Sequence, residues 1–435
     1  MQLPKYLRVR QRFPERRLPD IPGAVISELE ASGMAAGLPS GARVAIGAGS
    51  RGIANLSAIV GAAVRFWQAR GMAPFLFPAM GSHGAATAEG QVAVLARYGI
   101  TEETMGCPIS RSMDVVSLGS TSDGIETVLD RAAFESDGVM VVNRVKWHTS
   151  FEGHIESGLF KMMAIGLGRF AGAQHYHMHA YRAGLEAVIR SVGRKMLASG
   201  KVLGGLAVLE DAYHNTAQVT AVRASDMESR EVELLAQVKS WMGRILVDEI
   251  DVLILDEIGK EISGTGMDTK VVNRSRLGEY NPWPYAPRVH RIFVRDLSPH
   301  TAGSAMGIGM ADMVTDRLLA RTDWKTTYIN SLTAGSLAIV RTPIHFATDR
   351  ECLEALFKCV GKAESSQVTY GWIRNSLALG EIGLSENLRG PIERHPQMEI
   401  QGLAHPLEFD AGGNLVSPFL APSSLPELDE PVAVE

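Results

Sequence analysis

Five of the twelve histidines lie in one short stretch, residues 143–180, which also contains two lysines. Histidine titrates near neutral pH and binds metal ions, so such a cluster is typical of proton transfer or of a metal site. The five are His148, His154, His175, His177 and His179. The last three alternate along the chain, so they would share a face of a strand but spread around a helix. The stretch has no H-E-x-x-H motif and no carboxylate between these last three, and the sequence leaves both interpretations open.

Lys161 is the only charged residue in the apolar run of residues 158–165 (GLFKMMAI). Burial of an ammonium group without a partner is costly, so such a lysine either has a chemical function or extends its amine to water. Desolvated lysines are also the ones that form covalent adducts. The local sequence does not decide between these two alternatives.

Two glycine-rich turns carry the other candidates. Residues 81–87 (GSHGAAT) place His83 between small residues, where its ring can reach a ligand without crowding. Residues 47–52 (GAGSRG) match G-x-G-x-x-G, but an NAD site also needs an acidic residue about 20 positions later, and residues 31–88 contain none. What remains is one cation, Arg51, whose guanidinium suits a carboxylate or a phosphate. The alternative for both turns is an ordinary surface turn.

Short apolar runs rich in Val, Ile and Leu alternate with longer amphipathic stretches, a pattern that predicts an α/β fold with mostly parallel sheets. The predicted strands are residues 43–47, 74–78, 138–143, 203–209, 251–256 and 336–341. Residues 53–70 have helical spacing, and residues 227–246 are predicted to form one long charged helix. Open α/β sheets bind ligands beyond the carboxyl ends of their strands, where both glycine-rich turns fall.

A chain of 435 residues is too long for one ordinary core, so we expect two α/β domains with an active-site cleft between them. Residues 1–247 are predicted to carry the catalytic and cofactor-binding residues, and residues 248–420 to close the cleft. The last residues, 421–435, are rich in Pro and Glu and are predicted to be a loose tail.

Composition excludes several classes of protein. A net charge of -5 gives no general attraction to nucleic acid, and no apolar run is long enough to span a bilayer. The basic first residues lack the apolar segment of a signal peptide. The three cysteines, Cys107, Cys352 and Cys359, lie far apart, so we expect no disulfide framework and a cytoplasmic location.

At these residues the chain resembles the lactate racemase family, whose members carry a nickel-pincer nucleotide. Residues 81–87 are similar to its G-[ST]-H-x-x-x-T motif, and residues 143–148 (NRVKWH) resemble its N-x-x-K-P-H segment. Arg51, Lys161 and His177 follow the order of the family's substrate-binding arginine, cofactor-bound lysine and nickel-binding histidine. In the second half, residues 256–268 resemble a block found in family members. The resemblance spans roughly positions 40 to 390.

The resemblance implies a racemase or epimerase of 2-hydroxy acids. Arg51 would bind the substrate carboxylate, and His83 and His148 would be the acid–base pair, because inversion through a planar keto acid requires one such group on each face. Lys161 would hold the nucleotide covalently, and His177 would bind its nickel. The partners implied are the small 2-hydroxy acid and the enzymes that make the cofactor, with no nucleic acid and no membrane; a homo-oligomer stays open.

The chain also departs from the family pattern. Trp147 replaces the proline before His148, and Gly84 replaces the arginine after the motif histidine. The downstream polar residues of lactate racemase have no clear counterparts, and Lys270, with Arg274 beside it, is the candidate for a substrate-binding cation there. These changes put lactate in doubt and make a larger, more hydroxylated acid, such as an aldonic acid, at least an equal candidate.

Three other functions compete with the racemase. A hydrolase or lyase with a divalent metal bound by the cluster from His148 to His179 would be active with added zinc or manganese. A binding protein that has lost the cofactor would leave Lys161 unmodified. An NAD-dependent dehydrogenase ranks last, because the acidic residue that binds the ribose is missing.

Overall fold

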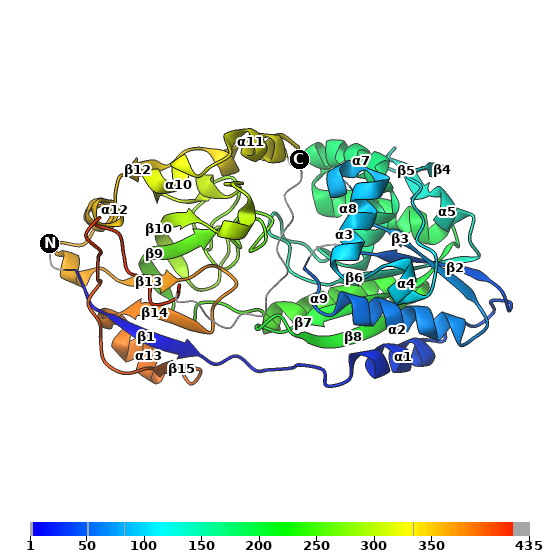
Figure 1. The fold of residues 1–435 in the computed structure, drawn as a ribbon, viewed down its shortest axis with the longest axis horizontal. Helices are drawn as coiled ribbons and strands as arrows, with labels where there is room; N and C mark the ends of the chain where they lie inside the picture. Colours follow the sequence, from blue (N-terminus) through cyan, green and yellow to red (C-terminus); the bar gives the residue numbers. More distant parts are fainter. Residues whose placement is uncertain (1–2, 50–51, 82, 334, 421–435) are drawn as a thin grey trace. The chain divides into compact units, whose positions relative to one another are not determined.

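The computed structural model describes residues 3–49, 52–81, 83–333 and 335–420 (Figure 1). The chain divides into two compact units. One consists of Pro14–Met242, and the other combines Met1–Phe13 with Gly243–Glu435. Each unit contains a mostly parallel sheet and several helices, so the predicted α/β class is confirmed. The predicted tail, residues 421–435, lies outside the described residues.

The unit of Pro14–Met242 is built on a five-stranded sheet in the order β3-β2-β6-β7-β8. All neighbours are parallel except β7 and β8, which are antiparallel. The strands are β2 (Arg43–Ala48), β3 (Ala73–Pro78), β6 (Gly138–Arg144), β7 (Val202–Glu210) and β8 (Thr216–Arg223). The first four coincide with predicted strands, because buried parallel strands are continuous runs of β-branched and aliphatic residues.

Helices cover both faces of this sheet, and the alternation of side chains along each strand decides which face a residue joins. On β2, Val44 and Ile46 pack with α1 (Ile21–Ser32) and α2 (Leu56–Gln68). Ala45, between them, packs on the opposite face, where three more helices add their apolar side chains. These are α6 (Leu159–Lys161), α8 (Leu185–Ala198) and α9 (Met227–Trp241).

The remaining elements of this unit connect the strands. They are η1 (Gly84–Ala86), α3 (Ala88–Arg97), α4 (Glu102–Met105), β4 (Val115–Ser120), β5 (Glu126–Asp130), α5 (Arg131–Phe134), the π-helix η2 (Met162–Leu167), α7 (Arg169–Ala183) and η3 (Ala224–Asp226). Strands β4 and β5 form a separate antiparallel pair. Helix α6, η2 and α7 follow one another along the chain and carry Lys161, His175, His177 and His179.

The other unit has an eight-stranded sheet in the order β12-β11-β10-β9-β13-β14-β1-β15. The strands from β12 to β13 in this order pair in parallel, and the last three join antiparallel. The strands are β1 (Tyr6–Gln11), β9 (Glu249–Ile258), β10 (Arg288–Leu297), β11 (Met313–Thr315), β12 (Ile344–Phe346), β13 (Tyr370–Ile373), β14 (Glu381–Ser385) and β15 (Met398–Ile400).

Helices α10 to α13 and several short turns complete this unit. The helices are α10 (Asp316–Ala320), α11 (Trp324–Thr333), α12 (Asp349–Leu356) and α13 (Arg389–Arg394). On β9, Leu253 and Leu255 belong to one core cluster, and Val252 and Ile254 belong to the cluster that packs under α12. The sheet therefore separates two apolar layers, as in the first unit.

Three details of the prediction are wrong. The first 13 residues belong with the second unit, because β1 pairs with β14 and β15 and buries Leu7 and Val9 in their core. Residues 336–341 form no strand, since Ile339 and Val340 are buried by a single turn, η6 (Ala338–Val340); short apolar runs do not distinguish these alternatives. The charged helix α9 ends at Trp241, five residues early.

Cys107, Cys352 and Cys359 are all free thiols. In the part of the chain that the structure describes, no helix has both the length and the apolar character needed to cross a membrane.

Candidate active site

The candidate residues of the first unit follow the carboxyl ends of β2, β3 and β6. The chain runs from β2 to β3 on one side and later places β6 on the other side of β2, which makes a topological switch point between β2 and β6. There the Gly49 N–H donates to the Val142 carbonyl oxygen at 3.3 Å, and a Cβ added to Gly49 would lie 2.8 Å from Asn143 Oδ1. The turn after β2 therefore approaches β6 closely only because residue 49 is a glycine.

The segment after β6 is a looped excursion whose two ends are joined by hydrogen bonds. Asn143 Nδ2 donates to the Gly158 carbonyl oxygen at 2.9 Å, and the Lys146 N–H donates to the Ser157 carbonyl oxygen at 2.9 Å. Asn143 and Lys146 of the predicted N-x-x-K-x-H motif thus close the loop. The loop places the histidine of the motif, His148, at the end of α6.

His148 and Lys161 are in direct contact, with 2.9 Å between His148 Nε2 and Lys161 Nζ. The Ser150 N–H donates to His148 Nδ1 at 3.0 Å, and the Phe151 ring lies against the imidazole with 4.4 Å between centroids. Because Nδ1 accepts a hydrogen bond, the neutral ring carries its proton on Nε2. Nε2–H can donate to Lys161 only if the lysine is a neutral amine with a lone pair. The arrangement therefore favours a nucleophilic Lys161.

Lys161 is held by the helical segment that contains it. Its neighbours Phe160 and Met162 are buried in the core against the sheet, while Lys161 itself is half-buried. Directly after Lys161 the α-helix widens into the π-helix η2. Such π-turns occur often at functional sites, because the extra residue redirects the side chains at the junction.

The turn that carries His83 packs against η2. A Cβ on Gly166 would lie 2.7 Å from the Ala79 carbonyl oxygen, and a Cβ on Gly81 would lie 3.0 Å from Ile165 Cγ2. These small residues let the end of β3 lie directly on the π-helix. The turn with His83 and the helical segment with Lys161 are consequently neighbours in the same layer.

A buried amide holds the His83 turn from the other side. Gln91, on α3, is fully buried and donates through Nε2 to the Gly81 carbonyl oxygen at 2.8 Å. The His83 N–H donates to the Met80 carbonyl oxygen at 3.2 Å, and Gly84 adopts a φ of 60° that favours glycine. Gly84 is thus required by the backbone of this turn.

Arg169 and Asp130 form a buried ion pair that residue type and spacing did not reveal. Arg169 Nε lies 3.4 Å from Asp130 Oδ2, with both side chains fully buried, and Arg169 also donates to the Pro78 carbonyl oxygen. Burial raises the pKa of the Asp130 carboxyl and lowers the pKa of the Arg169 guanidinium. Arg169 has a φ of 55°, which is strained for a large side chain. The pair connects the first residue of α7 to the end of β5, and the bond to Pro78 connects the same arginine to the end of β3, just before the His83 turn.

The other clustered histidines do not converge on one point. His175 and His179 lie one helical turn apart on α7 with 4.7 Å between ring centroids, and His177 is exposed on the same helix. His154 is exposed, and its N–H donates to Glu186 Oε1 at 2.9 Å. Within the described ranges, no three His, Cys, Asp or Glu side chains are grouped so that they could hold a metal ion. The nickel-binding role of His177 stays a prediction.

The two predicted substrate-binding cations are Arg51 and Lys270. Arg51 lies outside the described residues. Lys270 belongs to the other unit and is 4% exposed, with its ammonium 3.6 Å from the centroid of the Trp283 ring. Arg274, beside it, is also buried and forms an ion pair with Asp312 at 3.1 Å. Substrate binding by Lys270 stays a prediction, and the observed contact is a cation–π interaction.

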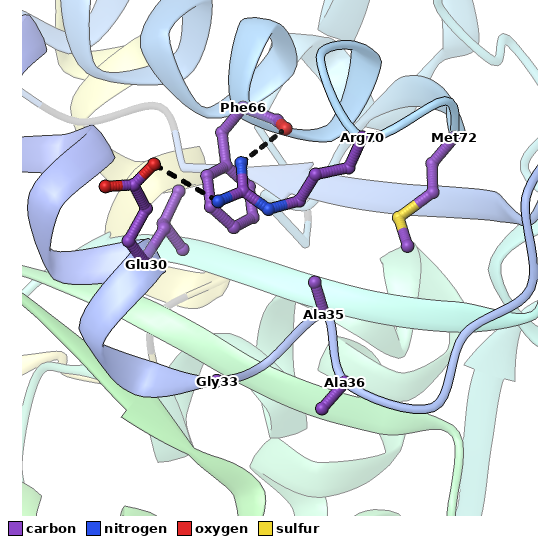
Figure 2. A pocket seen from close by; sticks show the side chains of 8 residues that line it. Glu30, Gly33, Ala35, Ala36, Phe66, Arg70 and Met72 are labelled. Atoms are coloured by element: carbon purple, nitrogen blue, oxygen red, sulfur yellow. Dashed lines mark hydrogen bonds and ion pairs between the residues drawn. The ribbon is translucent and has the colours of Figure 1, made fainter.

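A surface hollow of about 360 Å³ lies elsewhere on the first unit, between the ends of α1 and α2 (Figure 2). Arg70 crosses it, donating to Glu30 Oε1 at 3.2 Å and to the Phe66 carbonyl oxygen at 3.3 Å. Its lining consists of Leu29, Glu30, Gly33, Ala35, Ala36, Phe66, Arg70 and Met72. None of the predicted acid–base or cofactor-binding residues lines it, so the hollow is separate from the candidate site.

No protein-family model matches the chain, and no curated protein matches it in sequence. A crystal structure of a Thermotoga maritima protein is similar to it, with a TM-score of 0.50 and 12% identity, over 85% of this chain and 99% of that one. The lactate racemase apoprotein of Thermoanaerobacterium thermosaccharolyticum gives a TM-score of 0.48 and 12% identity, over 86% and 99%. At such identity the likeness to the Thermotoga maritima protein concerns the fold alone.

Proposed function

We propose that this chain is a racemase or epimerase that inverts the C2 centre of a 2-hydroxy acid, with a nickel-pincer nucleotide attached to Lys161 and with His83 and His148 as the acid–base pair. The observation that carries the proposal is the 2.9 Å contact between Lys161 Nζ and His148 Nε2. It joins the two least ordinary residues of the sequence at the switch point of a parallel sheet, where α/β enzymes bind ligands.

The residues present fit such a cofactor. A neutral lysine amine is the form that bonds covalently to an acyl or carbonyl carbon, and a proton donated from His148 Nε2 would favour that form of Lys161. His177, exposed on the helix that follows η2, would supply the imidazole that binds the nickel. When bound, the nucleotide supplies an acceptor for the substrate's α-hydrogen as hydride.

The protein's own part is proton transfer and orientation. His148 exchanges a proton with the substrate hydroxyl at Nε2, which requires the proton of the neutral ring to lie on Nδ1. Once Lys161 is bonded to the cofactor, its nitrogen no longer offers a lone pair to the Nε2 proton. The proton of the neutral ring can then lie on Nδ1, and the hydrogen bond from the Ser150 N–H to Nδ1 has to open. His83, on the turn after a different strand, provides the second group, so that one histidine serves each face of the planar keto acid.

Intact mass measurement and peptide mapping test the attachment. The chain is expressed with the cofactor-making enzymes and nickel, beside a known lactate racemase as positive control and the variant Lys161→Ala as negative control. An adduct on the peptide with Lys161, followed by stereoinversion of lactate or of aldonic acids, is the expected result. An unmodified Lys161 beside a loaded control enzyme would overturn the proposal and favour a binding protein without cofactor.

A further inference from the structure

Helix α9 looks like a charged surface helix in sequence, yet two of its charged side chains point into the protein. Glu231 is fully buried, and Lys239 is partly buried two turns later. Between them, Leu234, Leu235 and Val238 pack into the core cluster that also contains Phe160. The helix is therefore fixed against the layer that carries Lys161.

Glu231 holds the segment that contains Lys161. Its Oε2 accepts the Phe160 N–H at 2.8 Å, and its carboxyl also interacts with the backbone N–H of Leu159. Its Oε1 is buried and has no hydrogen-bond partner among the described residues. Gly158 lies directly against this oxygen, and a Cβ there would clash with it.

Lys239 holds the loop that contains His148. Its Nζ lies 2.5 Å from Glu156 Oε1 and 5.1 Å from the centroid of the Trp147 ring. Glu156 is fully buried, and its Oε2 accepts the His148 N–H at 2.5 Å. Trp147, the residue that replaces the family's proline, thus lies beside the same ammonium group.

We propose that α9 sets the geometry of the reactive pair, with Glu231 and Lys239 as positioning residues for Lys161 and His148. One helix binds the backbone beside Lys161, at Phe160, and reaches the His148 N–H through Glu156, so it constrains the separation between the imidazole and the amine. Purely apolar side chains would hold α9 to the sheet at lower cost, because a buried carboxyl with one unpaired oxygen costs free energy. The inference rests on the proposed function in taking the pair to be the reactive one.

The reactivity of the Lys161 amine is the readout, because a merely structural role would leave it unchanged in folded protein. The purified chain is trace-acetylated with acetic anhydride at pH 7.5 and analysed by peptide mass spectrometry. The measured quantity is the ratio of the acetylation rate of Lys161 to that of the exposed Lys325 in the same molecule. We expect Lys161 to react faster than Lys325 in the wild-type chain, since only a neutral amine is nucleophilic.

Two variants disrupt the two contacts. Lys239→Met keeps the apolar stem and removes the ammonium, and Glu231→Ala removes the acceptor of the Phe160 N–H. Each is expected to lower the ratio roughly tenfold, the factor that one ordinary hydrogen bond carries. Glu231→Gln keeps an acceptor oxygen and is expected to restore the ratio. Glu233→Gln, the same change at a 64% exposed position of α9, is the matched control and should leave the ratio at its wild-type value.

The outcomes separate the inference from the proposed function. An unchanged ratio in folded Lys239→Met overturns the role of α9, and that variant decides the question if Glu231→Ala does not fold. If Lys161 of the wild-type chain is acetylated no faster than Lys325, the result overturns instead the reactive pair on which the proposed function depends.

Discussion

The buried carboxyl of Glu231 predicts how the stability of the first unit depends on pH. Burial raises the pKa of this carboxyl from its ordinary value of 4.5 to about 8, against the opposing hydrogen bonds from Phe160 and Leu159. Between these two pH values the folded protein binds a proton that the unfolded chain releases. The free energy of unfolding is therefore highest below pH 4.5 as far as this group is concerned, and it falls as the pH rises through 8.

The magnitude follows from the same two values. Between pH 6 and pH 9 the wild-type chain should lose about 3 kcal/mol of unfolding free energy through this group alone, as an order of magnitude. For a unit of this size that corresponds to a fall of roughly 6–12 °C in Tm. Glu231→Gln has the same shape, accepts the Phe160 N–H and does not titrate, so it should show no such loss.

Thermal and urea denaturation at pH 6 and pH 9, followed by circular dichroism, measure the effect. Other groups titrate in this range, and subtracting the change in Glu231→Gln from the change in the wild type isolates Glu231. The control Glu233→Gln, at an exposed position, should follow the wild type. Parallel losses in the wild type and in Glu231→Gln, within about 0.5 kcal/mol, would refute the reasoning, because the carboxyl would then titrate as in the unfolded chain.

Three further substitutions test neighbouring contacts. Gly158→Ala places a methyl group against Glu231 Oε1 and should lower both Tm and the acetylation of Lys161. In the double variant with Glu231→Ala, the losses of unfolding free energy in urea should be less than additive, and additive losses would contradict the contact. Asp130→Asn leaves a buried guanidinium without its counter-ion and should cost about 3–5 kcal/mol in urea denaturation, whereas a cost below 1 kcal/mol would contradict the buried pair. Asn143→Ala removes the 2.9 Å bond to the Gly158 carbonyl and should lower Lys161 acetylation severalfold, with Asn143→Asp as the matched variant that also cannot donate.

The alternation of apolar runs with amphipathic stretches was enough to predict the α/β class and the strands that position the site. Buried parallel strands are read from a few consecutive residues, and β2, β3, β6 and β7 begin and end close to their predicted bounds. Residue chemistry likewise singled out His148 and Lys161, because a lysine in an apolar run and a histidine cluster are unusual wherever they fold.

Local patterns failed where the partner of a segment lies far away in the chain. Residues 6–11 were not among the predicted strands, and only the fold shows that they form β1 and pair with β14 and β15 near the other end of the sequence. The alternation of the three histidines in residues 175–179 left a strand and a helix both open, and the structure shows the helix α7, with His175 and His179 on one face and His177 on another.

The sequence by itself determined which residue types could do chemistry and which strands end beside them, because these properties depend on a residue and its near neighbours. Only the tertiary structure decided that His148 Nε2 meets Lys161 Nζ, that the Ser150 N–H donates to His148 Nδ1, and that Glu231 and Lys239 of α9 contact Phe160 and Glu156. Glu231 is the clearest case. Its side chain is ordinary in a charged helix, and it acquires a high pKa and a role in positioning only because folding removes it from water and places it against the backbone of residue 160.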